Sequence, residues 1–186
     1  GDVATTLVKS LWIDKEITND YGRKAIKDLF GSAIMDFPKS TELMAKLVKI
    51  GSHPDSIVMD FFSGSSSTAH AVMAVNAEEG ANRRFIMVQL PEELAADSAG
   101  GKAGFKNIPD IGKERIRRAG KQVLENDSDE GWQRDVGFRV LKIDTSNMAD
   151  VYYAPDAQDK ANLDLFVDNI KPDRTAEDLL FQVMLD

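Results

Sequence analysis

The chain has 186 residues, 42% of them hydrophobic and 29% charged, which suits one compact domain, or most of one, with enough apolar material for a core. It contains no apolar run long enough to cross a membrane and no signal-peptide pattern, and the lack of cysteine excludes disulfides and thiolate metal sites. We therefore expect a cytoplasmic protein. The net charge of −8 argues against strong binding of DNA phosphates by this chain alone.

The first predicted elements are helical. A helix-like stretch around residues 25–30 is ended by Gly31. The next predicted helix begins after Ser40 or Thr41, which are good N-cap residues, and ends at Gly51.

A strand–helix–strand unit follows. Residues 56–62 are predicted to form a buried strand that is apolar on both faces, the following helix ends by Gly80, and residues 83–90 are predicted to form a second strand. This order indicates a right-handed βαβ unit with a parallel sheet.

The later elements are less regular. We predict a helix over residues 111–124, a third strand over residues 138–143 and a short helix over residues 176–181. The helix over 111–124 has basic residues alternating with polar ones, which favours a solvated face over a DNA-phosphate contact. These basic residues are Lys113, Arg115, Arg117, Arg118 and Lys121.

The turn after the first strand carries the chemical signal. Gly64 lets the backbone approach a ligand closely, and the hydroxyl and N–H groups that follow lie at a helix N-terminus, where a carboxylate or phosphate is favoured. Asp60 can accept from an ammonium or a ribose hydroxyl, so S-adenosylmethionine fits this set. A strand-end turn with a serine-rich helix cap is an equally valid interpretation of the turn alone. A nicotinamide-binding, dehydrogenase-like domain is a weaker alternative, because G-x-G-x-x-G is absent.

The run from Asp60 to Thr68 resembles the S-adenosylmethionine motif of DNA amino-methyltransferases of the N6-adenine/N4-cytosine type. Five further segments resemble the modification subunit of type III restriction-modification systems in the same order along the chain. These segments are residues 37–40, 82–92, 111–119, 137–140 and 174–180. The resemblance covers residues 8–186.

The resemblance implies an α/β, Rossmann-like S-adenosylmethionine-dependent methyltransferase fold that is partial here, with about three strands of the sheet. It implies that residues 1–36 end an upstream region, residues 37–146 bind the cofactor and residues 147–186 are a C-terminal extension. The implied function is adenine-N6 methylation of DNA, with DNA, a restriction subunit and a second modification subunit as partners.

The resemblance also implies a set of cofactor-binding residues. They are Lys39, Ser40, Asp60, Phe62, Gly64, Ser65, Ser66, Thr68, Gln89 and Glu92. A solvated role for Lys39 and a core role for Phe62 remain open. No metal ligand is expected, because His53 and His70 have no partners at metal-ligand spacing.

Three positions depart from the family pattern: Ser66, Gln89 and Ser67, which stands in place of the first threonine. Ser66 stands where the family has a glycine, and its side chain would crowd the methionine end of the cofactor if the backbone needs a positive φ there. Gln89 stands where many relatives have an acid for the ribose, and it can hydrogen-bond the hydroxyls without charge assistance. Glu92 is the other candidate for that contact.

The catalytic Asp-Pro-Pro-Tyr-like motif of this family does not occur here, and Tyr152-Tyr153-Ala154-Pro155 does not match it. The resemblance places that motif before residue 1, so we expect no catalytic residue and no turnover from this chain alone. The alternative is a degenerate, non-catalytic assembly module. Because the strand over residues 56–62 is central in the family fold, its edge would be unpaired here. We therefore expect self-association of the chain, or cover of that edge by residues 1–36.

Overall fold

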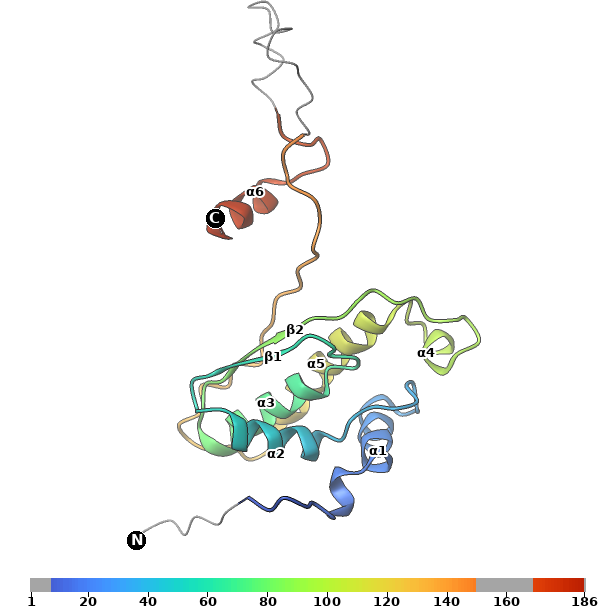
Figure 1. Cartoon of the computed structure of the whole chain (residues 1–186), viewed down its shortest axis with the longest axis vertical. Helices are drawn as coiled ribbons and strands as arrows, with labels where there is room; N and C mark the ends of the chain where they lie inside the picture. The colour runs from blue at the N-terminus through green and yellow to red at the C-terminus, as the bar shows by residue number, and fades with distance from the viewer. Residues whose placement is uncertain (1–7, 150–168, 186) are drawn as a thin grey trace, which may run out of the picture. The chain divides into compact units, whose positions relative to one another are not determined.

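The computed structural model describes residues 8–149 and 169–185 (Figure 1). The chain divides into two compact units, the first ending at Phe138 and the second beginning at Arg139. The elements in chain order are η1 (Lys15–Ile17), α1 (Asn19–Phe30), α2 (Thr41–Gly51), β1 (Ile57–Asp60), α3 (Ser67–Glu79), β2 (Arg84–Met87), α4 (Ala99–Lys102), α5 (Ile108–Glu125) and α6 (Ala176–Leu185).

Local sequence accounts for the ends of several helices. Ser40 caps α2 by accepting a hydrogen bond from the backbone N–H of Leu43 at 3.1 Å, and Asn107 caps α5 through the N–H of Asp110 at 3.0 Å. Gly31 ends α1 with a left-handed backbone conformation. The predicted start of α2 is therefore confirmed at the Ser40 cap.

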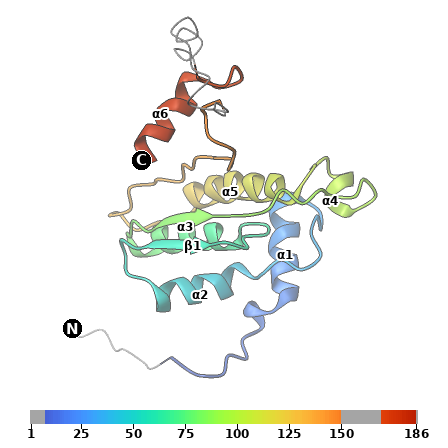
Figure 2. The ribbon, with the colours of Figure 1, turned by 45° about the horizontal axis from the view of Figure 1, so that its top comes forward.

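The predicted βαβ unit is present. β1 and β2 pair in parallel, with Ile57 opposite Arg84 and Asp60 opposite Met87, and α3 connects them. Figure 2 shows the two strands running side by side along α3. A parallel pair needs such a crossover, because its strands cannot be joined by a tight hairpin.

The helices cover one face of this two-stranded sheet. Val58, Phe85 and Met87 turn toward the helices and pack against apolar residues of α2, α3 and α5. The alternating residues Ile57 and Met59 are 52% and 59% exposed, because successive side chains of a strand point to opposite faces. The expectation that this strand is buried on both faces is therefore wrong for the described residues.

The core of the first unit is built around α3, which packs between α2 and α5. Nine of its 13 residues are buried, so α3 has little amphipathic character. Further apolar clusters join α1 to α5 through Ile26 and Ile111, and α3 to the end of α5 through Ala77 and Val123, with Trp132 of the following segment packed against them.

The expected third strand is not confirmed. Residues 138–143 have no strand assignment, and β1 and β2 are the only two strands in the described ranges. Ile143 is 99% exposed and Leu141 is 67% exposed. The described residues from 8 to 36 likewise form no strand that covers the free edge of β1.

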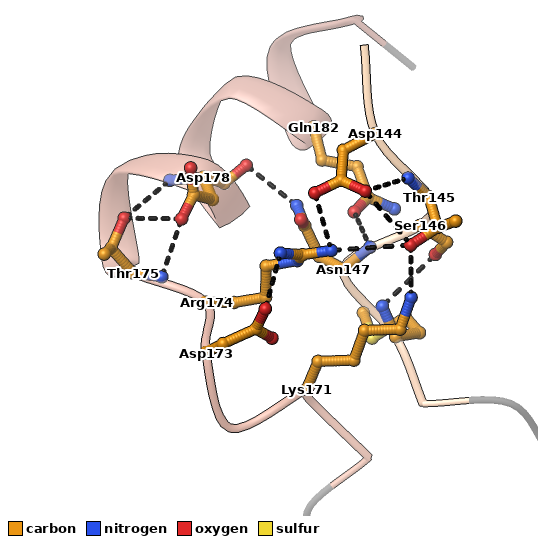
Figure 3. A network of polar contacts seen from close by, with 11 residues as sticks. Asp144, Thr145, Ser146, Asn147, Lys171, Asp173, Arg174, Thr175, Asp178 and Gln182 are labelled. Carbon is orange, nitrogen blue, oxygen red and sulfur yellow. Dashed lines mark hydrogen bonds and ion pairs between the residues drawn. The ribbon is translucent and has the colours of Figure 1, made fainter. Parts of the chain in front are cut away.

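The second unit is held by a polar network around Arg174 (Figure 3). Arg174 forms ion pairs with Asp144 at 3.2 Å and Asp173 at 3.0 Å, and Lys171 donates to the Thr145 hydroxyl at 2.6 Å. These contacts join residues 144–149 to the segment that leads into α6. The expected helix over residues 176–181 is confirmed and continues to Leu185. Across the described ranges, no helix combines the length and apolar character that crossing a membrane requires.

Candidate cofactor site

The Gly64 turn, residues 61–66, links the carboxyl end of β1 to the first turn of α3. Gly64 has a φ of 51° and Ser66 a φ of 60°, so two positions of the turn have left-handed backbone conformations. The N–H of Ser66 donates to the carbonyl of Ser63 at 2.7 Å, and the N–H of Ser63 donates to the carbonyl of Val88 at 3.1 Å. These bonds fix a tight turn beyond the ends of both strands, which is where open α/β sheets bind ligands.

Asp60 organises the turn from its first residue. One carboxylate oxygen accepts from the N–H of Phe62 at 3.1 Å, and the other accepts from the Thr68 hydroxyl. Asp60 and Thr68 therefore bind each other across the turn. Asp60 therefore caps the end of β1 in this structure.

Gln89 reaches the same turn from the chain that follows β2. Its side-chain oxygen accepts from the N–H of Gly64 at 2.8 Å. Glu92 is exposed, and its backbone carbonyl accepts from the N–H of Ile108 at 3.0 Å. The structure therefore brings Gln89 onto the turn, a contact that the sequence did not indicate.

Two phenylalanines of the turn lie at the surface. Phe62 is 80% exposed and Phe61 is 63% exposed, and their ring centroids are 5.2 Å apart. The core role that remained open for Phe62 is therefore wrong in this chain. The two rings form an exposed apolar surface beside the turn.

The segment before α2 lies next to the Gly64 turn. Lys39 has an exposed side chain, and its carbonyl accepts from the Ser67 hydroxyl at 3.1 Å. Ser40 is 1% exposed, and its hydroxyl donates to the carbonyl of Glu16 while it caps α2. The hydroxyl of Ser40 thus has a structural role in this chain, and Lys39 is the exposed cation of this segment.

A buried cation that sequence reasoning missed lies beneath the turn. Arg115 of α5 is 0% exposed, and its guanidinium donates to Ser65 at 2.9 Å, to Ser67 at 2.8 Å and to Thr41 at 3.0 Å. The expected solvated face is therefore wrong for Arg115, although Arg117, Arg118 and Lys121 are exposed. Burial lowers the pKa of Arg115 to about 10, against the opposing charge of Glu42.

A signal in the sequence points to this burial. Arg115 is four residues from both Ile111 and Ala119, so the three share one face of α5, and all three are buried. A cation on an apolar stripe predicts a buried charge with specific partners. Because basic and polar residues alternate along this helix, its basic residues were expected on a solvated face and the apolar stripe was not recognised.

His70, in the first turns of α3, lies close to the same charge. Its Nδ1 is buried without a hydrogen-bond partner in the described ranges. Burial, and then the charge of Arg115, lower the pKa of His70 to about 3, so the ring is neutral at physiological pH. In the described ranges no three His, Cys, Asp or Glu side chains gather as a candidate metal site.

The backbone φ of Ser66 is positive. This is the condition under which its side chain was expected to crowd the methionine end of the cofactor. Its side chain is 4% exposed and points to Gly112 of α5: a Cβ at position 112 would lie 2.7 Å from the Ser66 oxygen. The serine side chain thus occupies space that a glycine on α5 leaves free.

The turn presents groups suited to an anion. Ser66, at the N-cap of α3, makes no side-chain cap hydrogen bond, so it leaves the first N–H groups of the helix uncapped by a side chain. The N-termini of α2 and α3 meet at the Lys39–Ser67 contact, and both dipoles favour negative charge there. A ligand that places a carboxylate at the turn and an apolar ring on Phe61 and Phe62 fits this arrangement.

Comparison with known proteins shows a family match that includes the Gly64 turn. The model of a family described as DNA methylase, of the N6/N4 type, matches residues 4–99, which include the whole Gly64 turn. The chain is 39% identical over 132 residues to the type III restriction-modification enzyme StyLTI Mod subunit of Salmonella typhimurium, a match that covers 71% of this chain and 20% of that protein.

Two more relatives extend the comparison. The EcoPI Mod subunit of Escherichia phage P1 is 32% identical over 141 residues, covering 76% of this chain and 21% of its own length. The type II methyltransferase M.KpnI of Klebsiella pneumoniae is 30% identical over 109 residues, covering 59% of this chain and 26% of its own length. The chain spans about a fifth to a quarter of these relatives. It therefore belongs to the DNA methylase family, and within that family it is similar to the Mod subunits of type III restriction-modification enzymes.

Proposed function

We propose that this chain is the S-adenosylmethionine-binding portion of a site-specific DNA adenine-N6 methyltransferase of a cytoplasmic type III restriction-modification system. Residues 37–146 form its cofactor-binding domain, of Rossmann-like methyltransferase type. The observation that carries the proposal is the Gly64 turn, whose two left-handed positions lead into the α3 N-terminus at the carboxyl end of β1.

Each predicted site residue has a role in this proposal. The backbone of Gly64, Ser65 and Ser66 binds the methionine end of the cofactor, and Lys39 lies near its carboxylate. Phe62 packs against the nucleoside, while Ser40, Asp60, Thr68 and Gln89 hold the turn and its surroundings in position. Glu92 is the acid available to the ribose. When bound, S-adenosylmethionine supplies the methyl group for transfer.

The whole enzyme has further partners in this proposal. Its relatives are named as Mod subunits of type III enzymes, which supports DNA as substrate and a restriction subunit and a second modification subunit as partners. The Asp-Pro-Pro-Tyr-like tetrapeptide does not occur in this sequence. We therefore expect the chain alone to bind the cofactor and to transfer no methyl group to DNA.

Calorimetric titration with S-adenosylhomocysteine tests cofactor binding. We expect saturable binding to the unmodified chain and weaker binding in Gly64→Ala, because a Cβ there would block the close approach of the ligand to the backbone, while the φ of 51° adds a conformational cost of about 1 kcal/mol. Gly104→Ala is the matched control: Gly104 also has a positive φ, and a Cβ there would contact nothing within 4 Å.

The possible results separate the two candidate functions. Absence of heat with a folded, unmodified chain contradicts the proposal and favours the degenerate assembly module. Equal loss of binding in both glycine variants contradicts the role of the Gly64 turn. Transfer of a labelled methyl group to DNA by this chain contradicts the expected inactivity.

A further inference from the structure

The buried guanidinium of Arg115 has an unusual set of partners. Its three hydrogen bonds go to the neutral hydroxyls of Ser65, Ser67 and Thr41. Among the described residues no carboxylate lies within ion-pair distance of it, and its Nε is buried without a hydrogen-bond partner. The acid whose charge acts on Arg115, Glu42, is exposed, and its carboxylate lies 2.9 Å from the Ser40 hydroxyl oxygen.

A buried charge without an ionic partner destabilises the fold, so buried ions in proteins are normally paired. A bound anion would supply that partner for Arg115. The three hydroxyls belong to the Gly64 turn, to the start of α3 and to the start of α2. The cation therefore lies under the point where two helix N-termini meet, and its field adds to their positive dipole ends. This point is electropositive in a chain whose net charge is −8.

We propose that Arg115 is a positioning residue for the carboxylate of the cofactor's methionine end. Its charge, which has no described carboxylate within ion-pair distance, attracts the cofactor carboxylate from beneath the turn. This inference rests on the proposed cofactor site. It adds to that site a positive charge from α5, outside the motif from Asp60 to Thr68.

The chemistry of the ligand separates this role from simple support of the fold. S-adenosylhomocysteine carries the carboxylate, and S-adenosyl-3-thiopropylamine is the same molecule without it. A residue that only holds the turn affects both ligands alike, whereas a charge that attracts the carboxylate affects the first ligand selectively.

The experiment titrates both ligands into four forms of the 186-residue chain: unmodified, Arg115→Gln, Arg115→Lys and Arg117→Gln. We expect Arg115→Gln to weaken S-adenosylhomocysteine about tenfold or more and the amine ligand by about twofold at most, as for loss of a charge-assisted interaction. Arg115→Lys keeps the charge and should recover part of the affinity. Arg117→Gln removes an exposed charge from the same helix and should change neither ligand.

Parallel weakening of both ligands in Arg115→Gln overturns the inference while the proposed function stands. Failure of the unmodified chain to bind either ligand overturns both. If Arg115→Gln does not fold, Glu42→Gln replaces it, because removing this exposed acid leaves the charge of Arg115 less balanced. Tighter binding of S-adenosylhomocysteine alone by Glu42→Gln then supports the inference, and an equal change for both ligands overturns it.

Discussion

Ser66 and Gly112 form a complementary pair between the Gly64 turn and α5. Ser66 has a left-handed backbone, which costs a residue with a Cβ about 1 kcal/mol relative to glycine. Its buried side chain uses the space above Gly112, where a Cβ would come within 2.7 Å of the serine oxygen and 3.3 Å of the Gly64 carbonyl. The Ser66 side chain thus faces α5, where its neighbour is a glycine, Gly112.

This pairing predicts non-additive stability changes. Gly112→Ala should lower the free energy of unfolding by about 1–3 kcal/mol through overpacking, and adding Ser66→Gly should recover part of that loss. Urea denaturation of both single variants and the double variant measures the coupling. Gly51→Ala is the control, because a Cβ there would contact nothing within 4 Å. Strictly additive effects would show that the two positions do not share this space.

At the scale of elements, Asn76 fixes where β2 begins. Its buried side-chain amide donates to the carbonyl of Arg83 at 2.8 Å and accepts from the N–H of Arg83 at 3.0 Å. The next residue, Arg84, donates through its N–H to the carbonyl of Ser56 at 2.9 Å, which starts the parallel pairing. One side chain of α3 therefore sets the end of the crossover and the register of the sheet.

Replacing this amide should destabilise the chain strongly. We expect Asn76→Leu to lower the free energy of unfolding by about 2–4 kcal/mol, because both backbone groups of Arg83 become buried without partners. Glu78→Ala, on the exposed side of α3, breaks only a surface ion pair with Lys49 and should cost less than about 1 kcal/mol. Chemical denaturation measures both changes, and equal values for the two would contradict the role of Asn76.

At the scale of the first unit, the sheet has one face covered by helices and one face exposed. Ile57, Met59 and Ile86 lie on the exposed face, and within the described ranges β1 pairs with β2 alone. Exposed apolar faces and unpaired strand edges promote association between chains. The alternative that residues 1–36 cover the edge has no support from the described residues 8–36, which contain no strand.

We therefore expect the 186-residue chain to self-associate in a concentration-dependent way, measured by sedimentation velocity. Met59→Lys places a charge on the exposed face and should shift the chain toward monomer. Gln122→Lys adds the same charge to an exposed position of α5 and should leave association unchanged. A chain that remains monomeric at every concentration would contradict this expectation.

The elements that were predicted well depend on residues close together in sequence. Caps, end glycines and apolar periods indicated α2, α3, β1, β2 and α5. The third strand over residues 138–143 was not confirmed. Alternation of apolar and polar residues shows that a segment could lie in a sheet, but it does not show whether a neighbouring strand is present.

The candidate site was likewise predictable only where it depends on residues close together in sequence. Gly64 and the serine-rich turn follow from local chemistry, because a strand, a glycine and a helix start determine where backbone N–H groups gather. The contact of Gln89 with Gly64 spans 25 positions, and the exposure of Phe62 depends on what covers the sheet. Neither is readable from a local pattern.

By itself, the sequence determined the βαβ unit, the turn at the end of β1 and the family to which they belong. Only the tertiary structure decided that one sheet face is open and that Ser66 faces Gly112. It also decided that Arg115 lies buried beneath the turn, fifty positions along the chain from Ser65. The physical reason is range: backbone conformation and capping act within a few residues, whereas burial and charge placement depend on which distant segments pack together.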